Sequence, residues 1–202
     1  TALEGNAYVK TVDVAADKLT NNQSATLTAD VINGAAGTFE NAGTTEVGTG
    51  TGTAIDVATA TNADTLNVAG DVSGTDLTNS GTLDVTGAFA SAATLTNQSG
   101  ATATIGSYAG GTSTNAGTAT VSGVISAGQL DNTGELTLGG VNTGGTVNNN
   151  AGTLNLNNDN NGATINNADQ GTLVIQAGGI TNSGGTIDLS SGASGTSTVD
   201  IS

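Results

Sequence analysis

The feature that most constrains this sequence is a repeat of roughly 18 residues that runs through nearly the whole chain. An asparagine recurs in step with it, at Asn21, Asn41, Asn62, Asn79, Asn97, Asn115, Asn132, Asn149, Asn167 and Asn182. Two residues before each asparagine stands a large apolar side chain, except at Ala60 and Ser113. Two columns that keep step over this length are not a property of a disordered chain.

A second motif runs in phase with the asparagines. It is clearest at Gly81-Thr82-Leu83-Asp84-Val85, and weaker copies stand at 64–68, 117–121, 134–138, 152–156, 171–175 and 185–189. Apolar residues two apart with a polar residue between them indicate a strand with one buried face. We therefore expect the following side chains to point inward: Leu66, Val68, Leu83, Val85, Leu136, Leu138, Leu154 and Leu156.

Such short strands cannot bury their apolar faces alone, but they can when each strand pairs with its copy in the next turn. The 32 glycines suit tight corners, and the absence of proline suits continuous strand ladders. The sequence therefore predicts an all-β chain, a right-handed parallel β-helix (β-solenoid) of about 10 turns of roughly 18 residues. The hand follows from the right-handed preference of parallel strand crossovers.

The two ends of the chain depart from the repeat. Residues 1–18 contain both lysines and are predicted to form a cap or a strand-exchange segment, followed by β-helix repeats over 19–202. The last residues have the pattern of an open strand, which is a template for another chain. We predict end-to-end self-association through Val9, Val12 and Val14 at one end and Val199 and Ile201 at the other. The residues that follow Thr1 do not have the pattern of a signal peptide, so we expect a mature or excised segment.

Composition argues against several function classes. The chain has no cysteine and no histidine, only two basic residues, and a net charge of −15. Nucleic acid and anionic membrane surfaces are therefore not expected partners, and no apolar run is long enough to insert into a membrane. Carboxylates are scattered and arginine is absent, so we expect no enzymatic activity. No cofactor is expected; calcium is only weakly indicated, because Gly184-Gly185-Thr186-Ile187-Asp188 lacks the full calcium-binding repeat.

The asparagine column has a structural interpretation and a ligand-binding one. Stacked side-chain amides at equivalent corners can hydrogen-bond along the axis of a solenoid. We therefore assign a structural ladder to Asn62, Asn79, Asn97, Asn115, Asn132, Asn167 and Asn182. The outward threonines of the second motif suggest ice binding, but the parallel column contains Glu46, Asp84 and Asp188, which disfavours it.

The phrases Leu77–Val85 and Leu130–Leu138 resemble repeats of bacterial autotransporter passengers and filamentous-haemagglutinin-like adhesins. The resemblance covers roughly residues 19–189 and implies a secreted β-helix displayed on the surface of a bacterium. It is specific for architecture rather than activity, because adhesins, fibre proteins and some enzymes share this scaffold.

These features predict a structural surface-fibre or adhesin solenoid that associates end to end into filaments. The alternative is a ligand-binding adhesin segment that recognises a glycan or a host protein. Aromatic side chains usually anchor such contacts, and only Tyr8, Phe39, Phe89 and Tyr108 are present, which favours the structural interpretation. An ice-binding solenoid and a polysaccharide-degrading β-helix enzyme are the less favoured alternatives.

Overall fold

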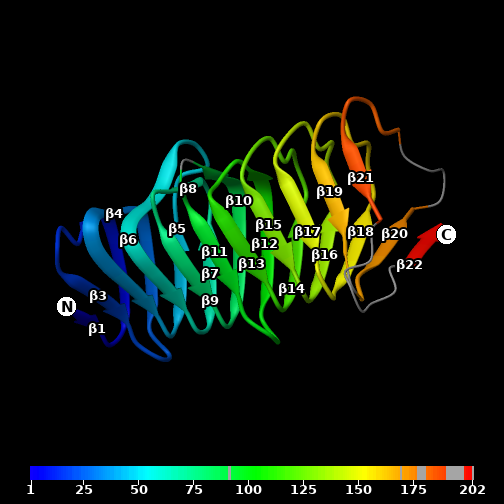
Figure 1. The fold of residues 1–202 in the computed structure, drawn as a ribbon. Coiled ribbons are helices and arrows are strands. Elements are labelled where there is room, and N and C mark those ends of the chain that lie inside the picture. Colours follow the sequence, from blue (N-terminus) through cyan, green and yellow to red (C-terminus); the bar gives the residue numbers. More distant parts are fainter. Residues whose placement is uncertain (91, 169, 177–180, 190–197, 202) are drawn as a thin grey trace.

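The chain forms a rod of stacked coils, with the first and last strands at opposite ends (Figure 1). This computed structural model describes all residues except 91, 169, 177–180, 190–197 and 202, and only the backbone of 198–201. The described residues contain strands and no helix, and each strand pairs in parallel with its copy in the next coil. The predicted parallel β-solenoid of about ten turns of roughly 18 residues is therefore confirmed.

Each coil contributes a strand to what we call the first face, which carries the asparagine column. Two longer strands, β4 (Thr26–Asn41) and β6 (Thr53–Asn62), turn corners and reach this face with their last residues. The remaining strands of the first face are β1 (Ala2–Leu3), β3 (Lys18–Asn21), β9 (Asp76–Asn79), β11 (Thr94–Asn97), β13 (Thr112–Asn115), β15 (Gln129–Asn132), β17 (Thr146–Asn149), β19 (Thr164–Asn167) and β21 (Thr186–Asp188).

The second face carries the Thr-Leu motif and is also continuous from end to end. It takes the first residues of β2 (Asn6–Asp13), β4, β10 (Thr82–Ala90) and β12 (Thr102–Tyr108). The other strands of the second face are β5 (Thr44–Val47), β7 (Thr65–Val68), β14 (Thr118–Val121), β16 (Glu135–Leu138), β18 (Thr153–Leu156), β20 (Thr172–Ile175) and β22 (Thr198–Ile201).

The third face shortens along the rod. In the first half it contains the later residues of β2, β10 and β12, the middle of β4, the start of β6, and β8 (Asp71–Ser73). In the second half it shrinks to single bridges, which connect Tyr108, Ile125, Asn142, Asn160 and Asn182. Its inward side chain changes along this series from apolar to asparagine.

Both ends of the described chain continue the solenoid. Residues 1–18, which the sequence sets apart from the repeat, provide β1 and β2, and these pair in register with β3 and β4 of the next coil. At the other end, β22 pairs in register with β20. The terminal strands β1, β2 and β22 therefore stack in parallel like the strands between them.

The core is a narrow tube of inward-facing side chains. All eight residues predicted to point inward on the second face are buried. They include Leu66, Leu83 and Leu136, which belong to one inward file, so this prediction is confirmed. Burial alternates along four-residue strands such as β7 and β16, because successive strand residues point to opposite faces of a sheet.

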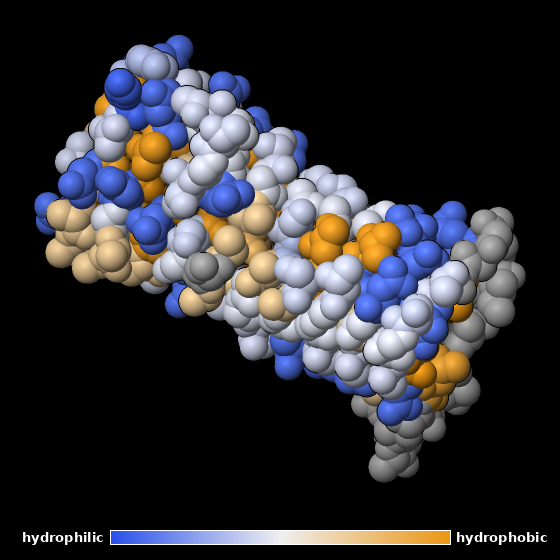
Figure 2. Space-filling model, turned by 90° about the horizontal axis from the view of Figure 1, so that it is seen from above, coloured by the Kyte–Doolittle hydropathy of each residue, from blue (hydrophilic) through white to orange (hydrophobic). Residues whose placement is uncertain are grey.

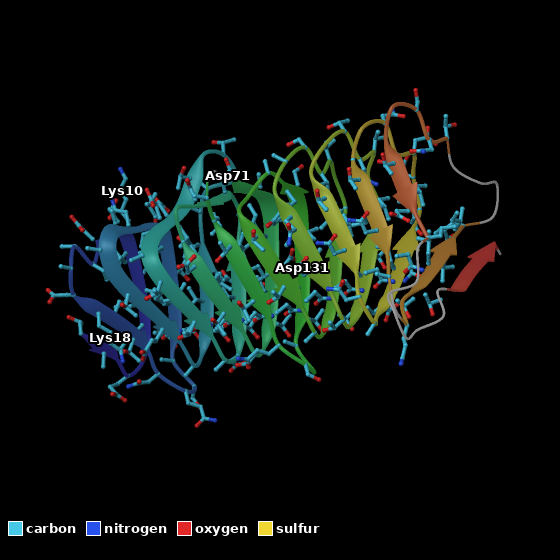
Figure 3. All side chains as sticks on the ribbon, viewed as in Figure 1. Lys10, Lys18, Asp71 and Asp131 are labelled. Carbon is cyan, nitrogen blue, oxygen red and sulfur yellow. The ribbon has the colours of Figure 1, made fainter. Side chains whose placement is uncertain are left out.

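The described outer surface is mostly polar, and few large apolar side chains reach it. Figure 2 shows small apolar patches scattered among hydrophilic and intermediate residues. Where side chains are described, the exposed large apolar residues are Tyr8, Val9, Val124 and Leu189. Lys10 and Lys18 both lie at the N-terminal end of the rod (Figure 3), where Lys18 pairs with Glu40 of the next coil.

Candidate functional site

A continuous file of asparagine amides runs along the inside corner of the first face. From Asn21 through Asn149, each side-chain NH2 group donates to the Oδ1 atom of the next asparagine over 2.7–2.9 Å, and Asn167 is the last acceptor. Through Asn149, each group also donates to the main-chain carbonyl of the first residue of a second-face strand in the next coil. The file thus binds one face to the next and adjacent coils to each other.

The structure places six of the seven predicted ladder residues in this file: Asn62, Asn79, Asn97, Asn115, Asn132 and Asn167. Asn21, Asn41 and Asn149 belong to it as well. Asn182 is not a member of this file as predicted, because it bridges to Asn160 on the third face, where these two amides form their own ladder bond. The copy of the Thr-Leu motif at 185–189 is out of phase for the same reason: β21 pairs with β19 on the first face.

A longer coil places Asn182 on the third face. Asn160 and Asn182 are bonded neighbours that lie 22 residues apart, whereas the ladder spacings in the middle of the rod are 17 or 18. The extra residues shift the phase of the last coil, so that the next asparagine in sequence falls on another face. Only strand pairing reveals the shift.

Asn160 and Asn182 form a short second file on the third face, and Asn160 also bonds to the main chain of the corner that follows it. Asn160 donates to Asn182 Oδ1 over 2.9 Å and to the carbonyl of Ala163, and its own Oδ1 accepts from the Ala163 amide. Asn142 occupies the preceding position of this file and is 0% exposed. Neither polar atom of its side chain has a hydrogen-bond partner among the described residues, so the file is incomplete at Asn142.

We predict that Asn142→Leu stabilises the protein by about 1–3 kcal/mol, because it removes an unsatisfied buried amide and extends the apolar file that ends at Ile125. The matched variant Asn160→Leu removes the bonds to Ala163 and Asn182, and it is expected to destabilise the protein by a similar amount. Urea denaturation of the two variants measures both effects. Opposite signs are expected, and equal losses of stability would contradict the assignment.

Tyr108 explains why the first-face column contains a serine at position 113. The buried Tyr108 ring reaches across the tube, and its hydroxyl lies 2.7 Å from Ser113 Oγ and donates to the Gly111 carbonyl over 2.7 Å. A large side chain at position 113 would occupy this space. Burial raises the pKa of the Tyr108 hydroxyl to about 12, against the opposing effect of the Ser113 hydrogen bond.

The raised pKa of Tyr108 predicts a loss of stability at high pH. Between the ordinary tyrosine pKa of 10.0, which applies to the unfolded chain, and the folded value of about 12, the folded chain retains a proton that the unfolded chain has lost. The free energy of unfolding should therefore fall by about 1.4 kcal/mol per pH unit across this window, and be unaffected by Tyr108 below it. Tyrosinate absorbance of the Tyr8→Phe variant, which retains Tyr108 as the chain's single tyrosine, measures the midpoint. Ionisation near 10 in the folded protein would contradict the prediction.

The predicted self-association residues differ in accessibility. Val9 is 37% exposed at the open end of the tube, and Val12 is partly buried against the core. Val14 is 5% exposed and lies beneath Gly34 and Gly37 of the next coil, so its side chain is already covered within the chain. Val199 and Ile201 belong to β22, whose side chains lie outside the described part of the chain.

One hollow, of about 230 Å³, opens on the outside of the second face. Its lining includes the exposed Glu46, Asn67 and Asp84 from neighbouring strands β5, β7 and β10, above the buried Val47 and Val68. Among the described residues, no hydrogen bond or ion pair involves the side chain of Glu46, Asn67 or Asp84. In the sequence, these residues are three consecutive interruptions of a column of threonines.

Over the described ranges, no three histidine, cysteine, aspartate or glutamate residues lie together as they would around a metal ion. No described helix is long and apolar enough to cross a bilayer. No protein-family model, curated protein or solved structure matches this chain.

Proposed function

We propose that this chain is a structural segment of a bacterial extracellular surface fibre or adhesin, in which the rod itself is the function. The observation that carries the proposal is the continuous asparagine file. The buried side-chain amides of this file bond to one another from coil to coil. Their hydrogen bonds therefore hold the coils together. About ten coils at roughly 4.8 Å each make a rod about 50 Å long.

In such a fibre, copies of the rod associate end to end. Within the described residues, β2 pairs with β4 on one side and with no strand on the other. Val9 follows the inward file of the second face, where its partner Ala29 is buried, yet Val9 itself is partly exposed because no coil covers it. A coil from another copy would cover Val9 and continue the main-chain ladder, as in strand addition generally.

Val9 and Tyr8 are adjacent residues whose side chains point to opposite sides of β2, so the same substitution at each tests this contact. Val9→Asp places a carboxylate over the open end of the tube, where solvent reaches it in the single rod but a stacked copy would bury it. Tyr8→Asp adds the same charge at a neighbouring position that is 71% exposed and belongs to the outward column. Electron microscopy and light scattering give the assembly state of both variants.

We expect filaments from the unmodified chain and from Tyr8→Asp, and single rods from Val9→Asp. Circular dichroism of Val9→Asp should match that of the unmodified chain, which separates loss of assembly from loss of fold. Single rods of the unmodified chain at every concentration would refute end-to-end association, as would filaments of Val9→Asp.

A further inference from the structure

The hollow on the second face combines an apolar floor with a polar rim. The floor is formed by Val47, Val68 and Ala69, and the rim by Glu46, Asn67, Asp84 and the threonines at 28 and 86. Its volume of about 230 Å³ lies below the usual range for drug-sized ligands. It therefore suits a single small ring rather than a macromolecular partner.

The three central rim side chains are left available for a ligand. Elsewhere on the rod, outward amides and carboxylates bond to each other: Asn155 donates to Glu135 on the same face, and Asn148 donates to Asp131 on the first face. Glu46, Asn67 and Asp84 occupy neighbouring positions with the same strand spacing, yet the described structure contains no such bond among them. Their hydrogen-bonding capacity faces the hollow.

The chemistry of the rim selects the kind of ligand. The carboxylates of Glu46 and Asp84 repel anions, and the chain places no basic side chain in the lining. Glu46 and Asp84 lie on strands two apart in the sheet, about 10 Å along the axis. Ligand oxygens bind a cation at about 2.4 Å, so one cation could bind both carboxylates only if the two side chains bent toward each other. Carboxylate and amide groups instead suit hydroxyls, and valine methyl groups suit the C–H face of a sugar ring.

We propose that this hollow binds a neutral sugar ring, with Glu46 and Asp84 accepting hydrogen bonds from its hydroxyls and Asn67 both donating and accepting. Val47 and Val68 contact the ring from below. The proposal does not depend on end-to-end association, because the hollow lies on the side of the rod, within strands β4, β5, β7 and β10. It gives the rod a side-on glycan contact without an aromatic anchor.

The experiment is a titration of the isotopically labelled full chain with D-glucose, D-galactose and N-acetyl-D-glucosamine, followed by NMR of the backbone amides. We expect at least one sugar to shift the amides around Asn67 saturably, with affinity near the millimolar level. Asn67→Ala should weaken that affinity about fivefold or more, equivalent to roughly 1 kcal/mol. Asn155→Ala is the matched control, because Asn155 lies in the same outward column of the second face but outside the hollow.

Three outcomes would overturn the proposal. The first is the absence of saturable shifts around Asn67 with all three sugars. The second is an equal loss of affinity in Asn67→Ala and Asn155→Ala, which would indicate non-specific contact. The third is that calcium chloride alone shifts these amides and Glu46→Gln removes the effect, which would make the hollow a cation site.

Discussion

Leu83→Asp is expected to abolish the folded rod around its own coil. Leu83 is 1% exposed and stacks between Leu66 and Ala103 in the second-face file, so its replacement would bury a carboxylate without a partner. Removing the leucine side chain alone costs about 2–5 kcal/mol, and the unpaired charge adds several more. In a solenoid each coil contacts only its neighbours, so the defect should break the rod locally before the distant coils unfold.

Circular dichroism and amide hydrogen exchange measure this effect. We expect strand signal to fall and protection to be lost first in β7, β10 and β12, which stack at position 83. Thr102→Asp is the control, because Thr102 is an exposed residue of the adjacent strand and its variant should remain within about 0.5 kcal/mol of the unmodified chain. A Leu83→Asp protein with unchanged stability would show that this file is not the core.

Asn115→Leu is expected to destabilise the protein by about 3 kcal/mol or more, although leucine has nearly the shape of asparagine. The substitution removes the bonds that Asn115 donates to Asn132, to the carbonyl of Gly117 and to that of Glu135. The Oδ1 atom of the buried Asn132 then loses its donor, and the NH2 group of Asn97 loses one of its acceptors. The loss should exceed that of a single neutral hydrogen bond because several buried groups are affected together.

Urea denaturation compares this variant with Asn150→Leu. Asn150 immediately follows the ladder residue Asn149 and is exposed, so its replacement tests the residue type without disturbing the file. We expect Asn150→Leu to change stability by no more than about 0.5 kcal/mol. Equal effects of the two substitutions would mean that the ladder contributes nothing beyond ordinary surface asparagines.

The architecture could be predicted from the sequence because the repeat consists of local patterns. Alternation around Leu83 and Leu136 identifies half-buried strands, and a constant interval between asparagines identifies stacking of equivalent corners. Burial of these leucines and the amide bonds of Asn62 to Asn167 follow directly from that periodicity. In a solenoid, contacts between coils are contacts between residues one repeat apart, so sequence spacing becomes spatial contact.

The exceptions to the periodicity could not be predicted in the same way. Ser113 breaks the apolar column, and only the tube shows that the Tyr108 ring fills its place from the opposite wall. Asn182 follows Asn167 at about one repeat, so its spacing alone places it in the first-face column. Only strand pairing assigns it to the file of Asn160. Contacts across the tube join residues with no fixed sequence offset, so periodicity does not reveal them.

The sequence by itself therefore determined the fold class, the repeat length and the side chains that face inward on the second face. The tertiary structure decided the phase of the last coil, the incomplete bonding of Asn142, and the hollow beside Glu46, Asn67 and Asp84. The physical reason is the same in each case. Local alternation determines which way a side chain points. What surrounds that side chain depends on the length of each corner and on the side chains that reach it from the other faces.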